Sequence, residues 1–454
     1  MALNDWVVAC LVALAVWILL SGLDDLFISL VWGLTAKKAF PWPSDAELQQ
    51  AVERRTAIFV PLWREHGVIR QMLDFNLAEI RYGNFDVFIG VYPNDEATFQ
   101  VVSEAGLRHH RVHLALVPHD GPTSKADCLN AIRRHMVEYE ARHGVNFETI
   151  VLHDAEDLIH PDSLRLINWY MRDYQMVQVP VLALPTGLNE FTHGLYCDEF
   201  AEYQQKDIPV RRKLGGFLPS NGVGTGFDRQ SMERIAAQRG GRMFDPACLT
   251  EDYETGYRLY LLGCRQIFVP VRFRGGAPVA TREYFPRNFR AAVRQRSRWI
   301  TGIVLQGWQN HGWGRGPGQL YWFWRDRKGM VGNLLAPAVN LLFLYGAMNG
   351  AIRQVLPGWL LPLYPATAAI ALVQVAIRMW TSARVYGWAF ASGVPLRMLW
   401  GNVLNCLATA AALRQFVVAR LRREKLAWRK TEHMYPVYAE GRLDVVLSRP
   451  EVGR

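Results

Sequence analysis

Three carboxylates follow a short apolar run near the middle of the chain. Ile150–Leu152 leads into Asp154, Glu156 and Asp157 within the stretch Thr149–Ser163. A short β-branched run with polar residues on both sides is typical of a buried strand of a parallel sheet. Ligands collect at the carboxyl ends of such strands, and clustered carboxylates repel one another unless a cation such as Mg²⁺ or Mn²⁺ shares the site. The stretch therefore predicts a metal site. The alternative is a solvated acidic turn that caps the next helix.

Charged side chains also follow the other predicted strands. Glu65 closes the first strand after Pro61, and Asp95 follows the second strand on the same edge of the sheet. A carboxylate at that edge suits the base and ribose of a nucleotide, although ordinary strand-to-helix turns have the same pattern. Lys125 ends a glycine-containing turn before a helix, an arrangement that binds phosphate. A lone lysine in a loop is otherwise a solvated surface residue.

Two helices carry the remaining candidates. Thr250–Asp252 precedes an amphipathic helix and supplies its N-cap in the simplest interpretation. Gln295, Arg298 and Trp299 lie within about one turn of a basic helix, so all three can address one ligand. An arginine binds a diphosphate bidentately, and a tryptophan face stacks on a sugar ring. A basic helix lying on lipid headgroups would explain the neighbouring arginines but not this full set.

The elements that position these residues alternate between strand and helix from Thr56 to about Phe273, which is typical of an α/β domain with a parallel sheet. The predicted strands are Ala57–Leu62, Phe85–Val91, Val112–Leu116, Thr149–His153, Val177–Leu182 and Arg265–Val269. The predicted helices are Val68–Ile80, Ala97–Gly106, Ala126–Arg142, Ser163–Arg172, Tyr196–Gln204, Gln230–Ala237 and Tyr253–Leu262. We expect the glycine-rich stretch Ser220–Gly226 to be a flexible loop through which backbone approaches an acceptor.

Apolar segments at both ends predict a membrane protein. The Val7–Leu23 run is close to the ~20 residues that span a bilayer, and Leu26–Leu34 fits a separate interfacial helix. Lys37 and Lys38 then place the following domain in the cytoplasm by the positive-inside rule. Three more segments are candidates for spanning or interfacial helices, with Arg378–Arg397 as an interfacial stretch between the last two: Gly329–Gly350, Gly358–Ile377 and Met398–Ala419.

Composition supports this organisation. The 454 residues include 16 Trp and carry a net charge of +10, which fits a membrane interface and an anionic substrate. No dense basic stripe or nucleic-acid module is present, so we expect no nucleic-acid partner. The 6 cysteines have no paired spacing and are expected to be reduced. We divide the chain into an anchor (1–38), an α/β domain (39–328), further membrane or interfacial helices (329–424) and a basic tail (425–454).

The ordered motifs resemble those of family-2 membrane glycosyltransferases, the superfamily of cellulose, chitin and hyaluronan synthases. They are Asp-x-Glu/Asp after the fourth strand, Thr-Glu-Asp at Thr250–Asp252, and Gln-x-x-Arg-Trp at Gln295–Trp299, with flanking membrane helices. The stretches Gly194–Tyr203 and Gly215–Gly226 are similar to the bacterial phage-adsorption protein B branch. The resemblance implies a GT-A-type, mostly parallel sheet in the cytoplasm, on the inner membrane of a bacterium.

The resemblance also implies a role for each candidate residue. Glu65 and Asp95 would hold the uridine of a UDP-sugar, and Lys125 would approach a phosphate. Asp154 and Glu156 would bind Mg²⁺ or Mn²⁺, with Asp157 beside them because the usual second aspartate is a glutamate here. Asp252, next to Glu251, would be the general base on the acceptor hydroxyl. The diphosphate and acceptor sugar would be bound by Gln295, Arg298 and Trp299.

These roles predict an inverting transferase that uses a UDP-sugar, with a preference for a UDP-N-acetylhexosamine implied by the branch, and that extrudes an exopolysaccharide. The alternatives are transfer of one sugar to a lipid or short acceptor, a metal-dependent phosphohydrolase, and a degenerate receptor or scaffold for phage adsorption. Three flanking helices are few for a channel, which favours a homo-oligomer or an outer-membrane export partner. Control by cyclic-di-GMP would be indirect. We expect Lys425–Pro436 either to bind lipid or to act as a gate.

Overall fold

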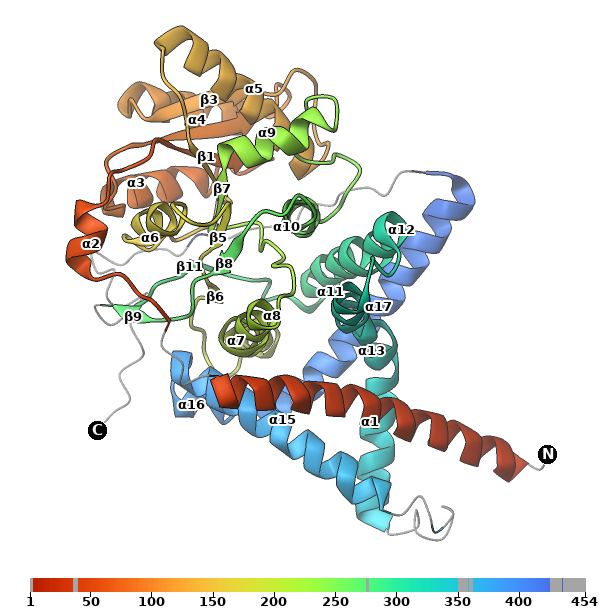
Figure 1. Cartoon of the computed structure of the whole chain (residues 1–454). Coiled ribbons are helices and arrows are strands. Elements are labelled where there is room, and N and C mark those ends of the chain that lie inside the picture. The colour runs from red at the N-terminus through yellow and green to blue at the C-terminus, as the bar shows by residue number, and fades with distance from the viewer. Residues whose placement is uncertain are drawn as a thin grey trace.

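Short strands rich in β-branched and aromatic residues build the centre of the molecule. The computed structural model describes residues 3–35, 40–274, 277–349, 358, 362–424 and 435. Its main sheet has seven strands in the order β3-β2-β1-β4-β7-β5-β8 (Figure 1). They are β1 (Thr56–Pro61), β2 (Phe85–Val91), β3 (Val112–Leu116), β4 (Thr149–Leu152), β5 (Met176–Gln178), β7 (Thr225–Asp228) and β8 (Gln266–Phe268). All neighbours pair in parallel except β7, so the predicted mostly parallel α/β sheet is confirmed.

Strand β7 corrects the prediction of a flexible loop at Ser220–Gly226. It lies antiparallel between β4 and β5, with Thr225 opposite Leu152. A side chain at Gly226 would bring its Cβ within 2.3 Å of Ile167, so only glycine lets helix α6 pack this closely on the strand. Glycine is usually depleted in strands, so the glycine-rich sequence did not predict the central strand β7.

The single strand predicted at Val177–Leu182 is two strands in different sheets. After β5 the chain turns at Val179 and Pro180 and continues as β6 (Val181–Ala183), which pairs in parallel with β11 (Thr281–Glu283). A further two-stranded sheet joins β9 (Phe273–Arg274) to β10 (Ala277–Pro278). An apolar run without alternation does not reveal where one strand ends and the next begins.

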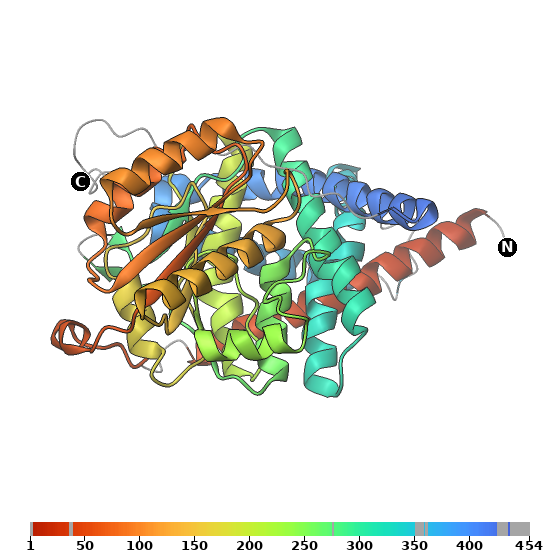
Figure 2. The same ribbon diagram turned by 90° about the horizontal axis from the view of Figure 1, so that it is seen from above.

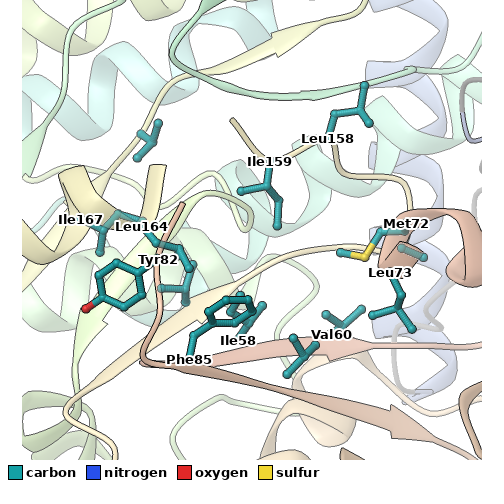
Figure 3. Packing of buried hydrophobic residues seen from close by; sticks show 14 of the residues in the cluster. Ile58, Val60, Met72, Leu73, Tyr82, Phe85, Leu158, Ile159, Leu164 and Ile167 are labelled. Carbon is teal, nitrogen blue, oxygen red and sulfur yellow. The ribbon is translucent and has the colours of Figure 1, made fainter. Parts of the chain in front are cut away.

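Helices cover both faces of the main sheet. On one face α3 (Ile69–Glu79), α4 (Glu96–Arg108) and α6 (Ser163–Tyr170) share a buried core with β1 and β2. Figure 3 shows part of this core, in which Leu158 and Ile159 of the acidic loop lie above Ile58 and Val60 of β1. The other face is covered by α5 (Lys125–His143), α9 (Arg229–Ala237) and α10 (Glu251–Leu261). The apolar residues Leu158 and Ile159 therefore anchor the acidic loop in the core that covers β1.

Several shorter helices complete the fold. These are α2 (Asp45–Gln50), α7 (Phe191–Glu202), α8 (Ile208–Lys213), α11 (Phe289–Trp299), α12 (Gly307–His311) and α16 (Trp388–Ala391). Two π-helical segments, Tyr203–Asp207 and Ile300–Gln306, continue α7 and α11 respectively. Such segments occur frequently at functional sites.

Four long helices lie on one side of the sheet domain. They are α1 (Leu3–Thr35), α13 (Pro317–Asn349), α15 (Leu363–Tyr386) and α17 (Val394–Arg422). Seen from above, α1 and α17 extend toward the same side of the molecule (Figure 2). In the part of the chain searched, three helices are long and apolar enough to cross a membrane: Val12–Thr35, Pro365–Tyr386 and Val394–Arg422.

The helix boundaries differ from the predicted membrane segments in two places. A single continuous helix, α1, contains both Val7–Leu23 and Leu26–Leu34. Asp24 and Asp25 lie in the middle of this helix, where their charges are compensated by Arg325 and Lys328 of α13. The predicted interfacial segment Arg378–Arg397 instead comprises the end of α15, α16 and the start of α17. Gly350 and most of 350–361 fall outside the described residues, as does the tail 425–454 apart from Tyr435, which is buried in the core.

Candidate active site

Nine of the eleven predicted site residues line a single cavity at the carboxyl edge of the main sheet. The cavity is bounded by the ends of β1 and β4 and by the start of α5 and α10, and α11 closes it from the side of the long helices. The nine residues are Glu65, Lys125, Asp154, Glu156, Glu251, Asp252, Gln295, Arg298 and Trp299. Residues more than 200 positions apart thus converge, as the shared sheet edge predicts.

Lys125 and Asp154 form the closest charged contact in this cavity. The Lys125 Nζ lies 2.6 Å from one carboxylate oxygen of Asp154 and 2.8 Å from the other. Burial disfavours the charged form of Lys125, but the negative charges of Asp154 and Glu251 outweigh it and raise its pKa. Ser124 caps α5 by accepting the N–H of Asp127, which fixes Lys125 as the first residue of the helix.

Asp157 lies behind the cavity rather than in its wall. It is fully buried, accepts the N–H of Asp154 at 3.0 Å, and contacts His153 Nδ1 at 2.7 Å. Its carboxylate therefore shapes the turn that presents Asp154 and Glu156. Asp157 does not line the cavity, and a metal contact from its carboxylate stays a prediction.

Asp95 is likewise outside the cavity wall. Its carboxylate accepts the N–H of Arg64 at 2.5 Å, and Arg64 has the unusual backbone angle φ of 56°. The bond stabilises the turn that carries Trp63 and Glu65 into the cavity. Asp95 thus holds the predicted base-binding loop, while Glu65 lines the space where a nucleotide would lie.

Glu251 and Asp252 begin α10 and face the same space as Lys125. Burial, followed by the charge of Asp252, raises the pKa of Glu251 to about 7. Burial also raises the pKa of Asp252, against the lowering effect of Lys125 and Arg298. Thr250 takes the N-cap position but makes no side-chain capping hydrogen bond. Thr250 is thus the N-cap residue by position, but a capping hydrogen bond from its side chain does not explain the Thr-Glu-Asp triplet.

Trp299 is held by aromatic rings on three sides. The ring centroids of Tyr196, Phe200 and Phe285 lie 6.0, 6.3 and 6.4 Å from that of Trp299. Gln295 and Arg298 share the cavity wall with Trp299, as their spacing on α11 predicts. One face of a rigid helix thus presents an amide, a guanidinium and an indole together.

Several cavity residues were not identified from the sequence. Glu283 of β11 is the most notable, because the backbone of Arg282 pairs with Leu158 and brings β11 beside the acidic loop. Burial and the charges of Asp157, Glu156 and Asp154 raise the pKa of Glu283 well above its ordinary value. No sequence signal links Glu283 to that loop. Trp63, Tyr92 and Asn221 also line the cavity.

The donor set fits a divalent cation shared with a ligand rather than a cage built by the protein alone. No cluster of three or more His, Cys, Asp or Glu side chains with metal-binding geometry occurs in the residues searched. Magnesium is commonly bound by one or two carboxylates together with substrate phosphates. Asp154 and Glu156 supply such carboxylates, and Lys125 already places a positive group against Asp154.

A second cavity opens from the first toward the long helices. The two share Asn221, Thr250, Asp252 and Trp299 in their walls, and the second has a volume of about 560 Å³. Its other walls come from α1, α7, α13, α15 and α17. Asp252 thus lies where the two spaces meet.

Comparison with known proteins decides what this arrangement belongs to. Residues 54–302, which contain every residue of the first cavity, match glycosyltransferase-like family 2. The chain is a family-2 glycosyltransferase. The resemblance drawn from the motifs is confirmed, and with it the assignment as an enzyme that transfers sugars.

Two curated relatives of this glycosyltransferase are similar over most of the chain. Bacteriophage adsorption protein B of Escherichia coli (strain K12) and bacteriophage N4 adsorption protein B of Escherichia coli O157:H7 are each 36% identical over 460 residues. The alignments cover 94% of this chain but 62% of each relative. The glycosyltransferase therefore spans less than two thirds of the length of these relatives.

The fold is shared with a solved glycosyltransferase. The mannosyltransferase PcManGT from Pyrobaculum calidifontis, in complex with GDP-Man and Mn²⁺, has a TM-score of 0.54 at 18% identity. The match covers 86% of this chain and 99% of that one. The family-2 glycosyltransferase thus has a GT-A-like sheet domain flanked by long helices.

Proposed function

We propose that this glycosyltransferase is a membrane enzyme of the bacterial inner membrane that transfers a sugar from a UDP-sugar, with inversion, to a growing exopolysaccharide. The observation that carries the proposal is the convergence of Asp252, Lys125 and Arg298 on one cavity that continues into a second cavity, in which every basic side chain is paired with a carboxylate. UDP and the preference for an N-acetylhexosamine rest on the family resemblance. The three candidate spans support a membrane location.

The donor diphosphate would lie between the acidic loop and α11. A divalent cation on Asp154 and Glu156 would neutralise the charge that develops on the leaving UDP. Arg298 faces the same space and would bind the diphosphate through its planar fork. Lys125 would exchange Asp154 for a phosphate when the donor arrives. Glu65, at the end of β1, would contact the base or ribose.

Asp252 is placed to act as the general base. It lines both cavities, so a donor sugar in the first and an acceptor hydroxyl in the second would meet beside its carboxylate. The carboxylate would take the hydroxyl proton as the new glycosidic bond forms and the bond to UDP breaks. A single displacement from the opposite face of the ring inverts the anomeric centre.

The walls of the second cavity favour a neutral glycan acceptor over a lipid phosphate. Each basic side chain in these walls contacts a carboxylate, so the walls offer no surplus positive charge. The pairs are Lys206–Glu202 at 2.5 Å, Arg211–Asp326 at 2.6 Å, Arg325–Asp207 at 2.6 Å, Arg378–Glu202 at 2.6 Å and Lys328–Asp24 at 2.7 Å. A phosphate here would lack an available cation, which makes its burial costly.

The decisive experiment measures UDP release by the detergent-purified protein across a panel of UDP-sugars, with Mn²⁺ or Mg²⁺. We expect metal-dependent turnover with one donor, accumulation of polymer, and a loss of about 10²–10⁴-fold in rate for Asp252→Asn, as for removal of a general base. Donor binding should persist in this variant.

Other outcomes would point to the alternatives. Release of free sugar that Asp252→Asn retains would favour the phosphohydrolase. Transfer of one residue only, onto a lipid or short acceptor, would replace the polymer reading. No turnover with any donor would favour the receptor or scaffold. Three further proposals need their own tests, on the protein together with its candidate partners. They are an export partner, a homo-oligomer and indirect control by cyclic-di-GMP.

A further inference from the structure

The loop before β7 is fixed from several sides. The Asn221 N–H donates to Gln178 Oε1 at 2.8 Å, and Gln178 Nε2 donates to the carbonyl of Val223 at 2.9 Å. The N–H of Gly222 donates to Ser220 Oγ at 3.1 Å. Gln178 and Ser220 are themselves 1% and 4% exposed. The loop is therefore a rigid support, and the side chain it presents has a defined position.

Asn221 is that side chain. It lines both cavities, together with Thr250, Asp252 and Trp299. Its Nδ2 group is enclosed and has no hydrogen-bond partner within the described ranges. An enclosed donor without a partner is costly, so a native structure retains one where a ligand satisfies it.

The neighbouring glycine fixes the distance between Asn221 and the proposed base. Gly222 has a backbone φ of 78°, and a Cβ there would lie 2.7 Å from Asp252 Oδ2. The loop backbone thus packs directly against Asp252, and Asn221 is one residue away. A sugar within reach of the Asp252 carboxylate is also within reach of the Asn221 amide.

We propose that Asn221 is a specificity-determining residue, whose side-chain amide donates a hydrogen bond to a neutral oxygen of the sugar at the junction of the two cavities. This inference rests on the proposed transferase function. The nearby carboxylates of Glu251 and Asp252 disfavour an anionic sugar such as a uronic acid. A neutral amide N–H is instead satisfied by a hydroxyl or by the carbonyl of an acetamido group.

The test separates recognition of the sugar from recognition of the nucleotide. Calorimetric titration gives the affinity for UDP and for each UDP-sugar, and kcat/KM is measured with the donor that turns over. Asn221→Ala removes the amide, and Asn221→Ser restores a smaller donor. Asn189→Ala alters an exposed asparagine before α7 and is the matched control.

We expect Asn221→Ala to bind UDP within twofold of the unmodified protein and to lose tenfold or more in kcat/KM, with partial recovery in Asn221→Ser. Comparison of hexose and N-acetylhexosamine donors shows which oxygen is bound, because the loss is larger for the sugar that carries it. Equal kinetics of Asn221→Ala and Asn189→Ala would overturn the proposal. So would a parallel loss of UDP affinity and thermal stability, which would make Asn221 purely structural. If the unmodified protein binds no sugar nucleotide, the proposed function itself fails and takes this inference with it.

Discussion

At the residue scale, the charges around Asp252 set the conditions under which the proposed base works. Asp252 is buried beside Glu251, which favours the protonated forms of both carboxyls. Lys125 and Arg298 oppose this by stabilising the negative charge on Asp252. Because the negative charge of Asp252 raises the pKa of Glu251, the two carboxyls do not lose their protons independently.

This coupling predicts a pH dependence. A protonated carboxyl cannot accept the hydroxyl proton, and burial raises the pKa of Asp252, so kcat/KM should rise with pH through an acidic limb above the ordinary carboxylate range. Glu251→Gln removes the neighbouring negative charge and should shift the limb to lower pH. The measurement is kcat/KM between about pH 5 and 9 at saturating metal. A limb at the ordinary carboxylate range near pH 4 would contradict the prediction.

The site residues that could be predicted from the sequence are those that belong to a local motif. Asp154 follows a buried strand, and Gln295, Arg298 and Trp299 lie on one helical turn, so spacing alone places them in a shared site. Glu283 and Asn221 were missed because their proximity to the site comes from tertiary contacts of β11 and of a loop with no local signal. Asp157 and Asp95 were grouped with the ligands because spacing does not reveal which way a side chain points.

At the element scale, three acids of α7 pair with other helices, two of them with the long helices α15 and α17 and one with α11. Asp198 pairs with Arg397 of α17 at 2.6 Å, Glu199 with Arg296 of α11 at 2.7 Å, and Glu202 with Arg378 of α15 at 2.6 Å. The same helix carries Tyr196 and Phe200, which contact Trp299. One helix therefore sets the position of the Trp299 indole relative to the helices expected in the membrane.

The most buried of these pairs should be the most sensitive. Arg397 and Asp198 are 1% and 0% exposed, so Asp198→Leu leaves an uncompensated guanidinium and should cost about 3–5 kcal/mol in unfolding free energy. Thermal unfolding in detergent measures this loss. Adding Arg397→Met should recover part of it, because no charge is then buried alone.

An exposed pair provides the control for Asp198→Leu. Asp173 and Arg265 are 3.9 Å apart and more than 60% exposed, so Asp173→Leu should leave the unfolding temperature nearly unchanged. Equal effects of Asp198→Leu and Asp173→Leu would show that α7 is held by packing alone.

At the scale of the whole molecule, two cavities of different character meet at Asp252. The first is rich in acids and carries Lys125 and Arg298, which suits a metal-bound diphosphate. The second is lined by paired charges and by aromatic residues such as Tyr203, Tyr253 and Trp322, which suit the hydroxyls and apolar faces of a neutral sugar chain. Under the proposed function, this division would separate the donor from the acceptor and would direct the product toward the long helices.

If the polymer leaves through the second cavity, a bulky side chain in that cavity should shorten the polymer chains. Met398 of α17 lines the cavity, whereas the adjacent Leu399 is 45% exposed and does not. Met398→Trp adds bulk on the proposed exit path, and Leu399→Trp adds the same bulk on the outer face of the same helix. We expect Met398→Trp to retain the UDP affinity and the first transfer, since neither needs the far end of the cavity, but to yield much shorter chains on a sizing gel. Chains of unchanged length in Met398→Trp would place the exit elsewhere, whereas equal shortening in both variants would indicate a general disturbance of α17. Shortening confined to Met398→Trp would support the second cavity, with its paired charges, as the exit path of the polymer.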